Sequence, residues 1–186
     1  LRDTQPRVRL LENEQNLGFV ASCNRGLGLR HAHAVVLNND TLVTAGWLAE
    51  LLEVLEASPR IAATSPLSNH APLCSVPAPS GFVAPEAIEA LPRWTEMPTL
   101  VGFCMLMRDE ALDLIGLFDP AFGRGYNEEN DWCQRAQRRG YTVARANRAF
   151  VHHLGAASFG DGRGELEVHN ARRLIARYPG YLAQNQ

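Results

Sequence analysis

The order of hydrophobic and polar positions along the chain predicts strands that alternate with helices. Compact apolar runs predict buried strands at residues 34–37, 61–64 and 100–107. Apolar positions at helical spacing, together with stop signals, predict helices at residues 19–29, 47–55, 109–115, 128–139 and 163–178. This alternation is typical of a layered α/β domain.

The strand expected at residues 34–37 has apolar side chains at every position. Such a run is typical of a strand that is buried on both faces of a parallel sheet. Shorter strands are expected at residues 8–12, 141–144 and 150–151. The stretch 65–98 contains seven of the eleven prolines, so it is expected to be a long irregular loop with one helix near 85–91.

Composition narrows the class of protein. Hydrophobic residues make up 46% of the 186 residues, which is enough for a substantial core, and the formal net charge is only −2. A near-neutral chain lacks the cationic surface of most nucleic-acid-binding proteins, so no nucleic-acid partner is expected. No apolar run is long enough to span a bilayer, and the four widely spaced cysteines fit reduced thiols in a cytoplasmic protein.

The first candidate for chemistry is the segment LNNDT at residues 37–41. Its acid, Asp40, follows a buried strand at once, and ligands of open α/β sheets bind outside the carboxyl ends of strands. A carboxylate there can bind a hard divalent cation, which in turn can hold phosphate oxygens. The same residues are also good turn and N-cap formers, and the segment alone leaves both interpretations open.

The second candidate is the start of the helix at 128–139, where Glu128, Glu129 and Asp131 fall in the first turn. Acids at a helix N-terminus are explained by the helix dipole without any function. The glycine-rich and aromatic segment 119–126 that precedes them would, however, bring carboxylates into a cleft. A crowded carboxylate there could gain a raised pKa and act as a general base.

The third candidate is the histidine pair His152 and His153. Adjacent residues of a strand point to opposite faces, so at most one of the two serves a given site. Neutral imidazole is a common metal ligand, although a lone histidine is more often an ordinary surface or core residue. Gly102, within a predicted strand, would allow a ligand to approach closely and could line a ligand pocket with Cys104; a packing role for this glycine is equally open.

The order of these motifs along the chain is more specific than any one of them. From about residue 8 to 159 the succession is NLGF (16–19), CNRG (23–26), LNNDT (37–41), GWL (46–48), PLSN (66–69), GFCMLMR (102–108), IGLFD (115–119), GYNEENDWC (125–133) and VHH (151–153). This succession resembles the family 2 glycosyltransferases, particularly their rhamnosyltransferase-like branch. The resemblance implies a GT-A-like, Rossmann-like three-layer α/β/α sandwich with a mostly parallel central sheet.

The resemblance also implies an inverting enzyme that depends on Mg²⁺ or Mn²⁺. It would transfer a sugar from a nucleotide-diphosphate donor to a saccharide or lipid-linked acceptor in cell-surface polysaccharide biosynthesis. The acidic metal- and donor-binding motif matches Asn38, Asn39 and Asp40, with Asp40 as the metal ligand. The pair that holds the catalytic base falls on Glu128 and Glu129, with Glu129 as the expected base. The late histidine of the metal site matches His153.

The same resemblance gives the expected domain organisation. Residues 1–160 would form the glycosyltransferase domain without its N-terminal nucleotide-binding strands, and residues 161–186 a C-terminal helical extension. The expected location is the cytoplasm, with peripheral association at the inner face of the membrane. The alternative is a non-catalytic fragment that binds nucleotide sugars or acts as a scaffold.

Overall fold

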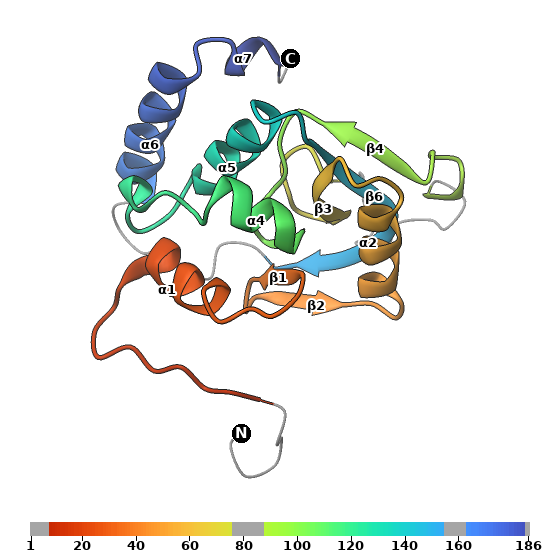
Figure 1. Cartoon of the computed structure of the whole chain (residues 1–186), viewed down its shortest axis with the longest axis horizontal. Helices are drawn as coiled ribbons and strands as arrows, with labels where there is room; N and C mark the ends of the chain where they lie inside the picture. Colours follow the sequence, from red (N-terminus) through yellow and green to blue (C-terminus); the bar gives the residue numbers. More distant parts are fainter. Residues whose placement is uncertain (1–7, 76–87, 155–162, 185–186) are drawn as a thin grey trace.

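The computed structural model describes residues 8–75, 88–154 and 163–184, which form one mixed sheet with helices packed against it (Figure 1). The described elements are α1 (Gly18–Leu27), β1 (Ala34–Leu37), β2 (Thr41–Val43), α2 (Trp47–Glu56), β3 (Ile61–Leu67), β4 (Trp94–Met97), β5 (Cys104–Met107), α4 (Asp109–Ile115), the 3-10 turn η1 (Pro120–Phe122), α5 (Glu128–Gln137), β6 (Thr142–His153), α6 (Arg163–Arg177) and α7 (Tyr181–Gln184).

The sheet has the strand order β1-β5-β3-β6-β2, and β4 also pairs with β6. Among the described strand pairs, β3 and β6 run parallel and the other four pairs are antiparallel. The expectation of a mostly parallel sheet is therefore wrong. A run of apolar residues reports burial but not strand direction, and the antiparallel strand β5 lies between β1 and β3 with all four residues buried.

Strand β1 also differs from its prediction, because only Val36 is buried and Leu37 is 41% exposed. Within the described residues β1 pairs with β5 alone, so it stands at an edge of the sheet. An edge position leaves part of an apolar strand in contact with solvent even when its composition is that of a central strand.

Side chains of the sheet alternate between two hydrophobic clusters, one on each face. On β5, Met105 and Met107 join the cluster formed with α1, α4, α5 and α6, whereas Cys104 and Leu106 join the cluster formed with α2. The period of two along a strand produces this division. Helices therefore cover both faces of the sheet.

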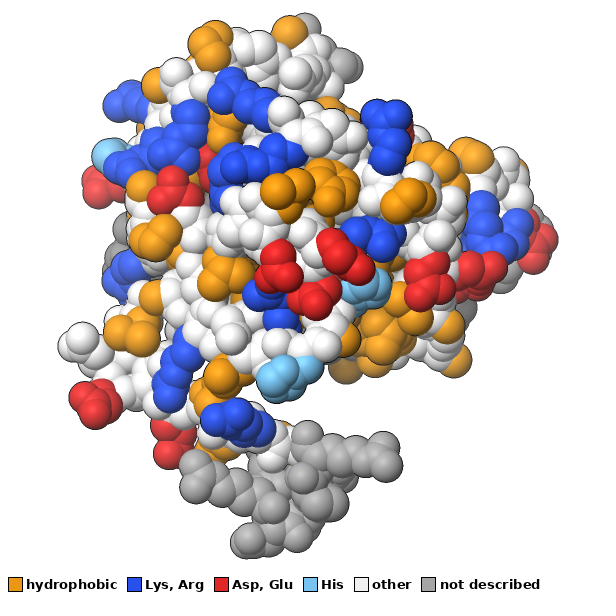
Figure 2. Space-filling view, viewed as in Figure 1, with side chains coloured by type: hydrophobic (Ala, Val, Ile, Leu, Met, Phe, Trp, Pro, Cys, Tyr) orange, Lys and Arg blue, Asp and Glu red, His pale blue; other side chains and the backbone are white. Residues whose placement is uncertain are grey.

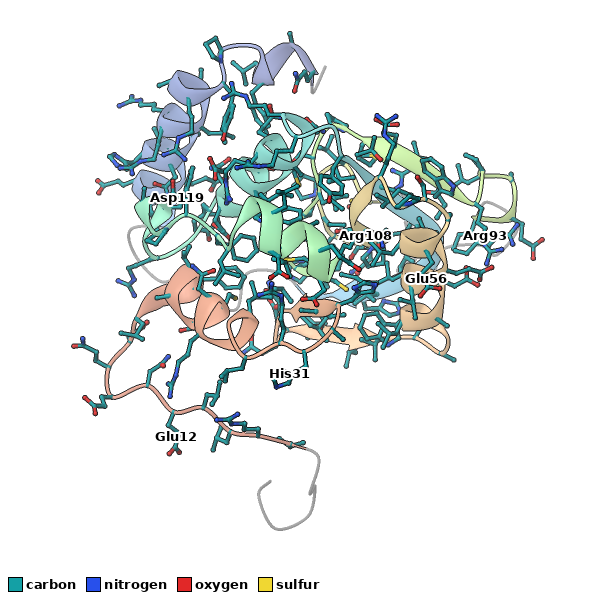
Figure 3. The ribbon with its side chains drawn as sticks, in the orientation of Figure 1. Glu12, His31, Glu56, Arg93, Arg108 and Asp119 are labelled. Atoms are coloured by element: carbon teal, nitrogen blue, oxygen red, sulfur yellow. The ribbon has the colours of Figure 1, made fainter. Side chains whose placement is uncertain are left out.

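The predicted helices at 19–29, 47–55, 109–115, 128–139 and 163–178 are confirmed with small shifts at their ends. Residues 8–12 form no strand and lie on a segment that runs away from the body of the molecule; Glu12 marks it in Figure 3. Of the helix expected near 85–91, residues 85–87 fall outside the described residues, and Ile88 and Glu89 are helical.

The two short strands expected at 141–144 and 150–151 are one strand, β6. Asn147 breaks the apolar pattern, yet it is fully buried. Its side-chain amide donates hydrogen bonds to Pro92 O at 2.7 Å and Thr95 Oγ1 at 2.8 Å. These bonds satisfy a polar side chain in the sheet and tie β6 to β4, a strand that lies within the expected proline-rich loop.

Helix α6 is anchored to α5 through Asp131, whose side chain is fully buried. Asp131 accepts hydrogen bonds from Arg135 Nε at 2.8 Å, Arg177 Nη1 at 2.7 Å and Tyr178 OH at 2.8 Å. Arg177, the last residue of α6, also donates to Asp119, which is labelled in Figure 3. Burial opposes the ionisation of Asp119, but hydrogen bonds from Ala121 N–H and Arg177 outweigh it and lower the pKa of this carboxyl.

Gly18 begins α1 with a φ of +79°, and its backbone packs against the loop that leads to α5. A Cβ at this position would lie 2.8 Å from Arg124 Cα, while Phe19 N–H donates to Arg124 O at 3.2 Å. We expect Gly18→Ala to lower the free energy of unfolding by about 1–3 kcal/mol, because it adds backbone strain and a contact with main-chain atoms. Urea unfolding monitored by circular dichroism measures this change.

Gly26→Ala is the matched control within the same helix. Gly26 has no positive φ, and nothing lies within 4 Å of the position that a Cβ would take there. Alanine at this position should raise the free energy of unfolding by up to about 1 kcal/mol through helix propensity. Equal effects of the two substitutions would contradict the packing assigned to Gly18.

Candidate functional site

A cavity of about 340 Å³ brings together residues from distant parts of the chain. Its lining includes Asn38, Gly102, Phe103, Glu128, Glu129 and His153, together with Glu167 of α6 and Tyr181 of α7. This volume lies within the range of small-molecule sites. The cavity therefore unites residues from all three candidate segments of the sequence.

Asp40 and His153 meet because β2 pairs with the end of β6. Thr41 is the partner of His153 in the antiparallel register, and Leu154 N–H donates to Asp40 O at 2.9 Å. The side chains follow the backbone, so that His153 Nε2 lies 3.4 Å from Asp40 Oδ1. The neighbouring His152 lies against the ring of Phe150 instead.

The imidazole of His153 is held on several sides. The Asn69 side chain bonds both backbone polar groups of His153, accepting from its N–H at 2.8 Å and donating to its carbonyl at 3.2 Å. His153 Nδ1 lies 2.9 Å from His70 O, and the ring stacks on Phe103 at a centroid distance of 5.0 Å. A carbonyl oxygen only accepts, so in the neutral imidazole Nδ1 carries the proton and Nε2 keeps its lone pair.

The pair Asp40 and His153 fits a divalent cation. Asp40 Oδ1 is buried without a hydrogen-bond donor, and it faces the lone pair of His153 Nε2. Carboxylate oxygen and imidazole nitrogen are both common metal ligands, and the Nδ1–H bond to a carbonyl is the usual support of a metal-binding histidine. No group of three or more histidine, cysteine or acidic side chains arranged to hold a metal occurs among the described residues.

Glu128 and Glu129 begin α5 after an unusual backbone. Tyr126 and Asn127 both have φ values of 70°, in the left-handed region, and Gly125 has a φ of 132°. Non-glycine residues in this region carry strain that often marks functional sites. The turn brings both glutamates to the cavity, with Glu128 only 4% exposed.

Burial raises the pKa of Glu129 to about 7, against the opposing effect of backbone N–H groups at the start of α5. Burial and then the charge of Glu129 raise the pKa of Glu128 well above its usual range. One carboxylate oxygen of each residue, Oε2, is buried without a hydrogen-bond partner. A carboxylate with a pKa near neutrality and a free oxygen has the properties of a general base.

The other predicted donor-binding residues differ in position. Asn38 lines the cavity, and its backbone N–H donates to Phe103 O at 2.8 Å, whereas Asn39 lies in the turn and is absent from the lining. Thr41 Oγ1 donates to Asn38 O at 2.7 Å, so the segment is also the turn that its composition indicated. Gly102 lines the cavity and packs against Glu129, where an added Cβ would lie 3.6 Å from Glu129 Cγ.

Cys104 does not lie in the cavity lining. Alternation along β5 turns it to the face covered by α2, where it is fully buried and its thiol pKa is raised to about 12 by burial. The interpretation of Cys104 as a sugar-pocket residue took its proximity to Gly102 in sequence as proximity in space. Sequence reasoning also gave no role to Phe103, Asn69 and His70, which hold His153. Phe103 lies in the GFCMLMR motif and Asn69 in the PLSN motif, which His70 follows directly.

Two further features concern the charge of the surface and the length of the helices. In Figure 2, basic side chains gather at the upper left over α6, and acidic side chains are scattered among the basic ones elsewhere, so no continuous cationic band crosses this face. No helix in the described part of the chain is both long and apolar enough to cross a membrane.

Comparison with known proteins supports the fold. No family model matches the chain. The chain is 29% identical over 167 residues to the uncharacterized protein Rv1525 of Mycobacterium tuberculosis and to the uncharacterized protein Mb1552 of Mycobacterium bovis, with 83% of this chain and 61% of each relative covered. The chain thus spans about three fifths of the length of these curated relatives.

Among solved structures, the chain is similar to GalNAc-T7, crystallised with UDP, GalNAc and Mn²⁺. The TM-score is 0.67 at 15% sequence identity, over 90% of this chain and 37% of that chain. The likeness shows a glycosyltransferase-like, GT-A-like fold.

Proposed function

We propose that this chain carries the catalytic site of an inverting, divalent-metal-dependent glycosyltransferase that uses a nucleotide-diphosphate sugar. The observation that carries the proposal is one cavity lined by His153, the partner of Asp40, and by Glu128 and Glu129. A cation site and a carboxylate of raised pKa are the two chemical functions that such a transfer requires. The fold shared with a glycosyltransferase that binds UDP and Mn²⁺ adds support.

In this proposal Asp40 and His153 hold Mg²⁺ or Mn²⁺, with Asn38 and Asn39 beside the donor. The bound metal would supply positive charge to the diphosphate, whose negative charge grows as the nucleotide departs. Asn69 and His70 keep the imidazole in the orientation that presents Nε2.

Glu129 acts as the general base. Its free Oε2 takes the proton of an acceptor hydroxyl while that oxygen forms a bond to the anomeric carbon. The bond from the anomeric carbon to the diphosphate oxygen breaks at the opposite side, so the nucleoside diphosphate leaves with the bonding electron pair. Attack opposite the leaving group inverts the anomeric centre.

The proposed metal site is tested by calorimetric titration of UDP, GDP and dTDP into the chain with and without MnCl₂. We expect binding that depends on Mn²⁺, and we expect Asp40→Asn and His153→Ala each to weaken it at least tenfold, because each removes one of two protein ligands. His152→Ala is the matched control, since His152 neighbours His153 but packs on Phe150. Its affinity should equal that of the unsubstituted chain.

Binding that does not respond to Mn²⁺, or equal losses for His152→Ala and His153→Ala, would refute the metal site. Metal-dependent binding without sugar transfer to any acceptor would favour the alternative of a non-catalytic nucleotide-sugar-binding protein. From the sequence resemblance alone we also propose membership of the family 2 glycosyltransferases, a saccharide or lipid-linked acceptor in cell-surface polysaccharide biosynthesis, and a role for residues 161–186 as a helical extension of the catalytic domain.

A further inference from the structure

The side chains beside Glu129 form a chain of hydrogen bonds that reaches the C-terminal helix. Asn130 Nδ2 lies 3.4 Å from Glu129 Oε1 and 3.1 Å from Asn127 Oδ1, and Thr99 Oγ1 lies 2.5 Å from Asn130 Oδ1. Tyr181 of α7 hydrogen-bonds to Thr99. Thr99, Asn130 and Tyr181 all line the same cavity as Glu129.

The direction of these bonds follows from donor and acceptor chemistry. A carboxylate only accepts, so Asn130 must turn its amide nitrogen to Glu129 and its oxygen to Thr99. Thr99 has a single hydroxyl proton, and the Asn130 oxygen is much nearer than the alternative acceptor, Leu100 O at 3.5 Å. The Thr99 proton is therefore used on Asn130.

We infer that Tyr181, Thr99 and Asn130 are positioning residues that together orient the Glu129 carboxylate for proton abstraction. The inference rests on the proposed function, in which Glu129 is the base. The chain of bonds holds Oε1 and leaves Oε2 as the oxygen without a partner. Because α7 supplies Tyr181, the C-terminal segment would take part in shaping the base.

The burial of these groups makes the arrangement stiff. Thr99 is 2% exposed, and the pKa of Tyr181 is raised to about 12 by burial and next by the nearby charge of Glu129, so the phenol stays protonated throughout the neutral range. The other titratable groups around Glu129 are Glu128 and Cys133 on its own helix, Glu167 from α6, His153 from β6 and Tyr126 in the preceding loop. In the described part of the chain, the Asn130 amide donates to Asn127 and Glu129 rather than to any of these groups.

The test is a pair of measurements on Thr99→Val, which keeps the shape of the side chain and removes its hydroxyl. Without the Thr99 donor the Asn130 amide is free to turn, and the ionised Glu129 loses a hydrogen bond that favours it. The apparent pKa of Glu129, followed by ¹³C NMR of the carboxyl carbon and assigned with Glu129→Gln, should rise by roughly one unit. Turnover near pH 7 should fall about tenfold and recover at higher pH.

Thr99→Ser should restore both the apparent pKa of Glu129 and the turnover near pH 7, because serine also has a hydroxyl. Tyr181→Phe is a second variant that disturbs packing little. It should change the pKa of Glu129 and the turnover in the same direction as Thr99→Val, by a smaller amount. The matched control is Thr64→Val, which removes another fully buried hydroxyl, bonded to Leu51 O at 3.1 Å, outside the cavity. It should leave the Glu129 titration unchanged.

An unchanged Glu129 titration in Thr99→Val, or an equal shift in Thr64→Val, would overturn the positioning role of Tyr181, Thr99 and Asn130. The NMR measurement needs no turnover, so it separates the two hypotheses. If the titration shifts in a protein that transfers no sugar, the positioning role is supported and the proposed function is refuted.

Discussion

Replacing Glu129 by glutamine is expected to lower sugar transfer by about 10²–10⁴-fold while Mn²⁺-dependent binding of nucleoside diphosphate persists. The amide keeps the size of the side chain but cannot take a proton, and a general base commonly contributes a factor of this order. Turnover is measured as release of nucleoside diphosphate, and binding by calorimetry. Full turnover in Glu129→Gln would show that another group removes the proton.

The pH dependence of turnover is a second test of Glu129 as the base. The base must be ionised, and burial raises the pKa of Glu129 to about 7, so turnover should rise with pH through the region around 7. The two glutamates interact, so this limb belongs to the pair as a whole. Because burial raises the pKa of Glu129, Glu128→Gln should leave the limb near pH 7, with turnover retained at pH 8. If Glu128→Gln lost turnover while Glu129→Gln retained it, Glu128 rather than Glu129 would be the general base.

Stability provides the control for correct folding. A carboxyl whose pKa is raised in the folded state binds its proton more tightly there than in the unfolded chain, so stability falls as pH rises from about 4.5 through 7. Glu129→Gln should therefore unfold at a higher temperature than the unsubstituted chain above pH 7, and at nearly the same temperature below pH 4. An inactive but more stable variant would exclude unfolding as the cause of the lost activity.

Asp131→Ala is expected to lower the free energy of unfolding by about 3–5 kcal/mol, the largest stability effect of any substitution proposed for this chain. Asp131 is fully buried and accepts hydrogen bonds from Arg135, Arg177 and Tyr178, which join α5 to the end of α6. Removal of the carboxylate leaves the two guanidinium groups and the phenol without their shared acceptor. Urea or thermal unfolding measures the loss.

Asp113→Ala is the control for Asp131→Ala. Asp113 also pairs with an arginine, Arg30, but its side chain is 72% exposed. Exposed ion pairs contribute at most about 1 kcal/mol, so this substitution should have little effect. Similar losses for the two aspartates would show that the buried network does not hold α6 in place.

The candidate site residues could be predicted from the sequence alone, because they stand at recognisable local boundaries. Asp40 follows an apolar strand, Glu128 and Glu129 begin a helix after a glycine-rich segment, and His153 ends a strand. The longer helices α1, α2, α4, α5 and α6 were also predicted from apolar patterns and stop signals, whereas the short α7 was not. The distinction between His152 and His153 needed only the two-residue period of a strand together with the family resemblance.

Contacts between distant segments could not be predicted in this way. Asp40 faces His153 because β2 pairs with β6 in one particular register, and nothing in either segment specifies that register. The same holds for Asn69, which clamps His153, and for Tyr181, which joins Glu129 through Thr99 and Asn130. These partners are ordinary polar residues whose roles depend entirely on what lies across the sheet or the cavity.

The sequence by itself determined the positions of the longer helices and of most described strands, the candidate acids and the late imidazole, because these depend on neighbours within a few residues along the chain. The tertiary structure alone decided the strand directions, the exclusion of Cys104 from the cavity and the raised pKa values of Glu128 and Glu129. Strand direction and burial depend on which segments meet in space, and the pKa of a carboxyl depends on the water and charge that this meeting removes or brings near.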